Sequence, residues 1–138
     1  MAVTAPPLPH LLCLVLYRCP NSDDFIYIAL SDNMDPLLST HLNSLFLICG
    51  DFSCYHANWL GAGSSLTSYG TAAKDFCDST GLTQSVNFPT QISPNGKYSF
   101  LDLVMTKFPT NVSCSFSAPI GSRDHMLVKV NISHTELP

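Results

Sequence analysis

Residues 45–53 read Leu45-Phe46-Leu47-Ile48-Cys49-Gly50-Asp51-Phe52-Ser53. The first five positions form a short, continuous apolar run, which predicts a strand buried on both faces. Asp51 therefore stands just past the end of a predicted strand. Loops at one edge of an α/β sheet gather in space and carry functional side chains, so Asp51 is a candidate site residue.

Two further segments place ionisable groups beside apolar runs in the same way. The segment Ser122-Arg123-Asp124-His125 comes directly before the apolar run 126–130, and Asp102 lies inside the run 100–105. Because these groups occur at or near predicted strand ends, we expect Asp51, Asp102, Asp124 and His125 to converge. Three carboxylates and one histidine are typical of a metal-assisted hydrolytic site.

The rest of the chain predicts an α/β arrangement with a mixed sheet in one domain, 11–138, after a disordered leader, 1–10. Ser22 is expected to cap a first helix that Pro36 interrupts or kinks, and a second helix is expected over 71–79. Residues 58–69 are predicted to form a loop and residues 94–97 a turn. The expected strands are 11–16, 45–49, 82–86, 100–105, 111–116 and 126–132. The expected core comprises Leu14, Leu16, Leu47, Cys49, Phe76, Leu103, Met105 and Val128.

The charge balance gives no basic footprint for a nucleic acid. Charged residues make up 12% of the 138 residues, and the net charge is −4 with only six Lys and Arg. Strong DNA binding by this chain on its own is therefore not expected. The low charge also implies an unusually neutral surface or one that another part covers.

The six cysteines form no C-x-x-C pair, so no zinc ribbon or finger is expected. Disulfides in a secreted protein are one alternative, but several cysteines lie in apolar runs, which favours reduced thiols in an intracellular protein. Residues 11–17 resemble a signal-peptide core in length, yet no Lys or Arg precedes them and a buried strand fits better. No apolar run approaches the ~20 residues of a membrane span.

Four segments together resemble the endonuclease/exonuclease/phosphatase superfamily. Residues 48–53, followed by His56 and Trp59, resemble its Gly-Asp-Phe-Asn segment. Leu101-Asp102-Leu103-Val104 is similar to the family's Leu-Asp segment, and residues 122–125 are similar to its Ser-x-Asp-His segment. The fourth segment, Tyr17-Arg18-Cys19-Pro20, is similar to the family's Tyr-Arg-x-Pro stretch. Residues 81–84 and 87–90 resemble the endonuclease domain of non-LTR retrotransposons. All four segments occur in the family's order.

This resemblance implies a DNase I-like, two-sheet α/β sandwich with mixed strands, of which the N-terminal half is missing. It also implies Mg²⁺-assisted cleavage of a phosphodiester, with DNA as the partner, no membrane partner, and the nucleus as a candidate compartment. Carboxylates without a cysteine cluster suit such a hard cation.

The resemblance also implies a role for each matching residue. His125 would contact the scissile phosphate or act as acid/base, and Asp102 would orient its ring. Asp51 would position or activate the attacking water, and Asp124 would help to hold the metal. Tyr17 would donate a hydrogen bond to a phosphate oxygen, and Ser53 would bind substrate.

Two departures from the family pattern predict weak catalysis. Ser53 stands where the family has Asn, and a hydroxyl offers one donor where a carboxamide offers two. The family's metal-binding Glu has no counterpart, because the only Glu is Glu136. The alternative function is accordingly a non-catalytic, degenerate remnant, and a small interaction module is a third class. Apolar sheet surface left uncovered would favour self-association.

Simpler readings compete with these roles. Taken singly, Asp51 is a turn residue, Asp124-His125 an ordinary loop pair, and Tyr17 a core aromatic with its hydroxyl at the surface. Their joint occurrence in order favours the functional reading for the acidic residues and His125, and narrowly for Tyr17. His56 is expected in a surface loop and Trp59 as a packing anchor, and solvent exposure is expected for His10, His41 and His134.

Overall fold

The structure, a computed structural model, describes residues 10–19, 25–41, 44–54, 56, 59–60, 67–119 and 125–133. Ser22, Asp124 and His134, for which the sequence makes predictions, lie outside these residues. Of the predicted leader only His10 is described, and it is exposed, as is His41.

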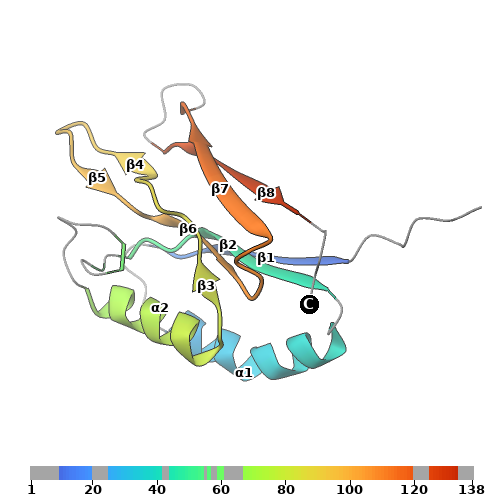
Figure 1. The fold of residues 1–138 in the computed structure, drawn as a ribbon. Coiled ribbons are helices and arrows are strands. Elements are labelled where there is room, and N and C mark those ends of the chain that lie inside the picture. The colour runs from blue at the N-terminus through green and yellow to red at the C-terminus, as the bar shows by residue number, and fades with distance from the viewer. Residues whose placement is uncertain are drawn as a thin grey trace, which may run out of the picture.

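The elements are arranged in layers, with both helices on one side of a central sheet and a β-hairpin on the other (Figure 1). In chain order they are β1 (Leu11–Tyr17), α1 (Phe25–Thr40), β2 (Leu45–Asp51), α2 (Ser68–Ser79), β3 (Thr83–Gln84), β4 (Gln91–Ile92), β5 (Tyr98–Ser99), β6 (Asp102–Thr106), β7 (Val112–Ser117) and β8 (Leu127–Ile132). Neither of the two helices in the described part of the chain combines the length and the apolar character that crossing a bilayer requires.

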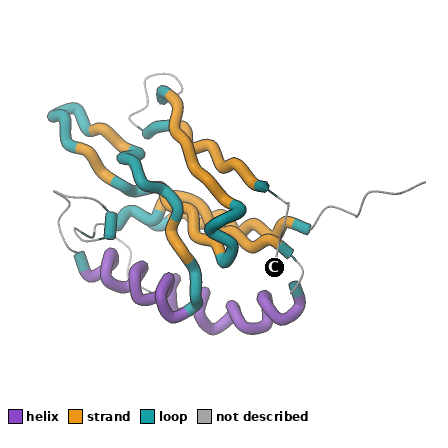
Figure 2. Tube along the Cα trace, viewed as in Figure 1, coloured by secondary structure: helices purple, strands orange, loops and turns teal. Residues whose placement is uncertain are grey.

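The central sheet has four strands in the order β1-β2-β6-β3. β1 runs parallel to β2, whereas β6 is antiparallel to both β2 and β3. The sheet is therefore mixed, as predicted. Two separate hairpins, β4-β5 and β7-β8, complete the described strands, and Figure 2 shows them above the central sheet.

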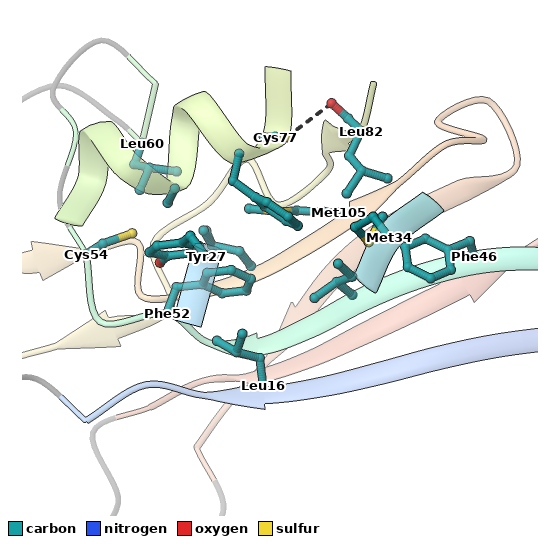
Figure 3. Packing of buried hydrophobic residues seen from close by; sticks show 14 residues of the cluster. Leu16, Tyr27, Met34, Phe46, Phe52, Cys54, Leu60, Cys77, Leu82 and Met105 are labelled. Atoms are coloured by element: carbon teal, nitrogen blue, oxygen red, sulfur yellow. Dashed lines mark hydrogen bonds between the residues drawn. The ribbon is translucent and has the colours of Figure 1, made fainter. Parts of the chain in front are cut away.

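One apolar core fills the space between the central sheet and the helices. α1 contributes Tyr27 and Met34, α2 contributes Phe76, and β2 contributes Ile48, which is fully buried. Figure 3 shows Tyr27 and Met34 among the side chains gathered between α2 and the strands. The Cys77 thiol donates a hydrogen bond to the Leu82 carbonyl oxygen at 3.1 Å, which ties the end of α2 to the segment that leads into β3.

A second core lies between the central sheet and the β7-β8 hairpin. It contains Leu45, Leu47, Val104 and Val112, with Val128 and other partly buried side chains packed against it. β2 therefore buries both of its faces, because alternate residues enter the two cores, as its continuous apolar run predicted. Two sheets packed face to face, with helices outside, confirm the predicted α/β sandwich.

The prediction that Pro36 interrupts or kinks the first helix is wrong about interruption, since α1 continues through Pro36 to Thr40. Proline removes one backbone donor, so the carbonyl of Asp32, four residues earlier, loses its helical partner. Asp32 and Pro36 are both exposed. Water can therefore solvate that carbonyl, and the helix tolerates the proline.

Two other boundaries differ from the prediction. α2 begins at Ser68 rather than at 71, because the Thr67 side chain accepts a hydrogen bond from the Gly70 amide and caps the helix. The expected 58–69 loop is therefore shorter at its end, and most of it lies outside the described residues. The predicted 94–97 turn joins β4 and β5, two-residue strands that the sequence did not indicate.

The predicted core is confirmed for Leu16, Leu47, Phe76, Leu103 and Met105, all of which are buried. Leu14, Cys49 and Val128 are only partly buried, although each packs against one of the two cores.

Replacing Leu47 by Ala is expected to lower the free energy of unfolding by ~2–5 kcal/mol, because Leu47 is 3% exposed and fills the core between the sheets. Leu11→Ala is the matched control. Leu11 is also a strand leucine but is 52% exposed, so its loss should cost about 0.5 kcal/mol or less. Urea melts of both variants measure the difference, and equal losses would remove Leu47 from the core.

Candidate functional site

A row of polar side chains crosses three strands at one end of the central sheet. Tyr17 of β1 pairs in register with Asp51 of β2, which pairs in register with Asp102 of β6. Side chains at paired positions project from the same face of a sheet. The row therefore lies on the face that carries the β7-β8 hairpin, because Asp51 and Asp102 alternate with residues of the helix-side core.

His125 joins this row from the chain that leads into β8. Its Nδ1 lies 2.8 Å from Asp102 Oδ2, and the two side chains are 36% and 22% exposed. Ligand atoms of Asp51, Asp102 and His125 all lie within 4.8 Å of one another. The convergence predicted for these three residues is therefore present, whereas the position of Asp124 lies outside the described residues.

Tyr17 stands at the open side of the row. It is 71% exposed, so the alternative that it is a core aromatic is wrong. Its register position beside Asp51 places it at the same strand end as the acidic residues. A phenol there can donate a hydrogen bond to a molecule that approaches from solvent.

Ser53 fixes the orientation of the Asp51 carboxylate. The Ser53 amide and hydroxyl both donate to Asp51 Oδ1, at 2.9 and 2.8 Å. Ser53 has a φ of 44°, in the left-handed region that non-glycine residues other than Asn and Asp rarely adopt. The backbone thus turns sharply after Asp51 and folds the hydroxyl back onto the carboxylate.

Arg18 is a site-supporting residue to which the sequence reasoning gave no role. It is 1% exposed, and its Nη1 donates to the Ser53 carbonyl oxygen at 3.1 Å. Its backbone amide donates to the Asp51 carbonyl oxygen at 2.9 Å, and its guanidinium lies 3.7 Å from the centre of the Tyr69 ring. Arginine is rarely buried. Only its place in the Tyr17-Arg18-Cys19-Pro20 segment signalled a role.

Thr90 supports the other half of the site. It is fully buried, and its hydroxyl oxygen accepts hydrogen bonds from the amides of Leu101 and Asp102, each at 3.0 Å. Its carbonyl oxygen accepts from the Met126 amide at 2.7 Å, and the next residue, Gln91, forms a β-bridge with His125. Thr90 therefore connects the segments that carry Asp102 and His125.

His56 and Trp59 pack together beside the helix-side core. Their ring centres lie 6.1 Å apart in an edge-to-face arrangement, and Trp59 packs against that core. The prediction of Trp59 as a packing anchor is confirmed. His56 lies in a loop, as expected, but its side chain is partly buried rather than at the surface.

We call the row formed by Tyr17, Asp51 and Asp102 the acidic row. A cavity of about 270 Å³ opens beside it, between the two sheets. Asp102 and His125 contribute to its wall, together with Cys49, Val128 and other apolar residues. Such a cavity is large enough for water or part of a ligand next to the histidine–carboxylate pair.

Cys54 follows the Asp51–Ser53 turn, and its thiol makes the free energy of unfolding depend on pH. Burial raises the pKa of this fully buried thiol from 9.0 to about 12. Below pH 9 the thiol is protonated in both states. Above pH 9 it ionises only in the unfolded chain, so stability falls with rising pH by up to ~1.4 kcal/mol per pH unit.

Cys54→Ala is therefore expected to make the alkaline decline in the free energy of unfolding shallower, whatever it costs at neutral pH. Urea melts at a series of pH values on both sides of pH 9 measure the slope. The parent chain, melted in the same buffers, provides the reference slope. An unchanged slope in Cys54→Ala would contradict the assignment.

The donor chemistry at the row suits a hard divalent cation. Asp51 and Asp102 offer carboxylate oxygens, which Mg²⁺ prefers, and it uses only one or two protein carboxylates and completes its shell with water and phosphate. His125 is engaged with Asp102 through Nδ1. The two carboxylates therefore fit a magnesium ion that shares its shell with a substrate.

Comparisons with known proteins bear on this arrangement. The sequence model of the family described as "Endonuclease-reverse transcriptase" matches residues 11–129. The fold is similar to the solved endonuclease domain of TRAS1, a telomere-specific non-LTR retrotransposon, with a TM-score of 0.66 and 13% sequence identity. That match covers 88% of this chain and 56% of the solved one, so the chain spans about half of that structure. No curated protein matches the sequence.

Proposed function

The chain belongs to the endonuclease-reverse transcriptase family, and from this we propose that its acidic row is the site of a Mg²⁺-dependent, DNA-nicking phosphodiesterase. The observation that carries the proposal is the bond between His125 Nδ1 and Asp102 Oδ2 at 2.8 Å, with the Asp51 carboxylate in the same cluster. A histidine held by one carboxylate next to a second carboxylate is an arrangement for proton transfer to a positioned nucleophile.

Within this proposal His125 contacts the scissile phosphate or serves as the acid/base. Because Nδ1 is committed to Asp102, proton transfer to or from a substrate runs through Nε2. Asp102 keeps the ring in place, as a carboxylate orients imidazole in a catalytic triad. Asp51, held by Ser53, positions or activates the attacking water.

The remaining groups contact the phosphate and the metal. Tyr17 donates a hydrogen bond to a phosphate oxygen from the exposed end of β1, and Ser53 adds a weaker contact than the family's Asn. Asp124 helps to hold Mg²⁺. The ion, when bound, stabilises negative charge that develops on the phosphate in the transition state.

The proposed partner is DNA, in an intracellular compartment that contains it, such as the nucleus. The chain's net charge of −4 offers little general attraction to a polyanion, so we expect weak DNA binding by the chain alone.

Self-association is part of the proposal as well. Leu11, Val15 and Tyr17 project from the outer strand β1 and are each more than half exposed, and a second copy can cover them.

A non-catalytic remnant is the competing function, and two residues favour it. The only Glu of the sequence is Glu136, and Ser53 replaces the family's Asn. The two functions differ in one measurable property, which is Mg²⁺-dependent nicking that requires His125.

The purified 138-residue chain is expected to nick supercoiled plasmid only slowly, near the EDTA background under multiple turnover. With so few carboxylates, a missing metal ligand leaves the ion poorly placed, and a misplacement of ~1 Å alone can cost ~10²-fold in rate. Ser53→Asn should increase the rate, because Asn restores the carboxamide and tolerates the φ of 44°. Plasmid nicking with Mg²⁺, against an EDTA control, measures both.

Fast Mg²⁺-dependent nicking by the unmodified chain would contradict the expected weakness. It would mean that the remaining carboxylates suffice or that a second chain completes the site. No Mg²⁺-dependent nicking by either protein, even with protein in excess over plasmid, would favour the remnant.

A further inference from the structure

Two cysteines meet on the face of the sheet that carries the acidic row. Cys13 of β1 and Cys49 of β2 lie on neighbouring strands, and their Sγ atoms are 3.6 Å apart. Neither residue has a place in the proposed phosphodiesterase site, and they are 36 residues apart in the chain.

The sulfur–sulfur distance distinguishes a disulfide bond from a metal site. A disulfide needs the sulfurs at ~2.05 Å, so they would have to approach by roughly 1.5 Å between strands whose register is fixed. A tetrahedral Zn²⁺-like ion with Zn–S bonds of ~2.3 Å holds two sulfurs about 3.8 Å apart. The observed distance therefore needs an adjustment of only a few tenths of an ångström to hold an ion.

The surroundings of the two sulfurs leave room for such an ion. Cys13 is exposed, and Cys49 lines the cavity of about 270 Å³ between the sheets. Water in the cavity can supply the remaining two ligands of a four-coordinate shell.

We propose that Cys13 and Cys49 are two ligands of a site for a thiophilic divalent cation such as Zn²⁺, separate from the oxygen-rich site at Asp51 and Asp102. Thiolates select soft cations, whereas carboxylates select hard ones such as Mg²⁺, so the two sites need not compete. Each thiol releases its proton to solvent when the ion binds, and affinity rises with pH for that reason.

The test uses Cd²⁺ as the probe, because cadmium–thiolate bonds give an ultraviolet charge-transfer band that carboxylates and imidazole do not produce. The reduced 138-residue chain is titrated with Cd²⁺ without oxygen and then with Zn²⁺ as competitor. Cys13→Ser and Cys49→Ser are compared with Cys19→Ser, which removes another exposed thiol and serves as the matched control. Circular dichroism verifies the fold of each variant.

We expect the parent and Cys19→Ser to show a Cd²⁺ band that Zn²⁺ abolishes by displacing the Cd²⁺. In Cys13→Ser and Cys49→Ser we expect the Cd²⁺ affinity to fall by more than ~10–100-fold, which is the cost of losing an outer-shell partner. Absence of the band in the parent, or parent-like affinity in Cys13→Ser or Cys49→Ser, would overturn the site. Cys13 is exposed, so Cys13→Ser decides the outcome if Cys49→Ser unfolds.

Discussion

His125→Ala is expected to reduce Mg²⁺-dependent nicking by ~10²–10⁴-fold, the range that a positioned acid or base contributes. The residue qualifies because its ring is oriented by Asp102 at 2.8 Å and lies in the same cluster as Asp51. Removing the imidazole leaves the carboxylates in place, so the metal-binding groups remain while the proton-transfer group is lost.

The measurement needs sensitivity, since the parent chain is expected to be slow. Single-turnover nicking, with protein in excess over supercoiled plasmid, is run in the Ser53→Asn background. Asp102→Asn should lower the rate in the same direction, because a carboxamide no longer stabilises a charged imidazole. His41→Ala is the matched control, as His41 is exposed and bonds to the Leu37 carbonyl oxygen of α1 instead. Equal rates for His125→Ala and His41→Ala would refute the assigned role.

Gly50→Ala is expected to destabilise the fold by more than ~4 kcal/mol, which is exceptional for a single substitution. Gly50 has a φ of 143°, and a Cβ built on it would lie 1.8 Å from the Leu16 carbonyl oxygen. That oxygen belongs to the backbone of β1, so it cannot move without breaking the β1-β2 register. The clash would separate the strands beside Tyr17 and Asp51.

Gly96→Ala isolates the contribution of the clash. Gly96 also has a positive φ, of 83°, but a Cβ there would meet no atom within 4 Å. Only the conformational cost of ~1–2 kcal/mol should appear. Urea melts of the two variants, together with circular dichroism of Gly50→Ala, provide the comparison. Similar losses at both positions would show that β1 and β2 can separate at little cost.

The sequence predicted the strands of the sandwich best where burial on both faces leaves a continuous apolar signal. The predicted run 45–49 lies inside β2, and the predicted run 100–105 overlaps β6 over Asp102–Met105. The sequence did not predict the two shortest hairpin strands, β4 and β5. β4 and β5 have two residues each, so their pairing depends on contacts made by neighbouring segments rather than on their own composition. Pro36 was misjudged because exposure of the freed carbonyl depends on the helix's position in the fold.

The sequence predicted that Asp51, Asp102 and His125 lie together, since each stands next to or within an apolar run. It did not predict the residues that support them. Arg18 and Thr90 act through backbone carbonyls and amides of segments distant in sequence, and such bonds leave no periodic pattern. Ser53 was identified from the family resemblance, but its double bond to Asp51 required the left-handed backbone that only the structure displays.

The row formed by Tyr17, Asp51 and Asp102 has a consequence for folding kinetics. Its members come from three strands, and His125 from a fourth segment, whereas α2 is built from contacts within a single stretch of chain. Contacts between distant segments form late, because closing the long loops between them costs entropy before any bond repays it. No part of the described chain smaller than the paired sheet contains the whole cluster. The chain therefore acquires its site only when β1, β2, β6 and the segment before β8 have come together, and loses it when any one of them separates.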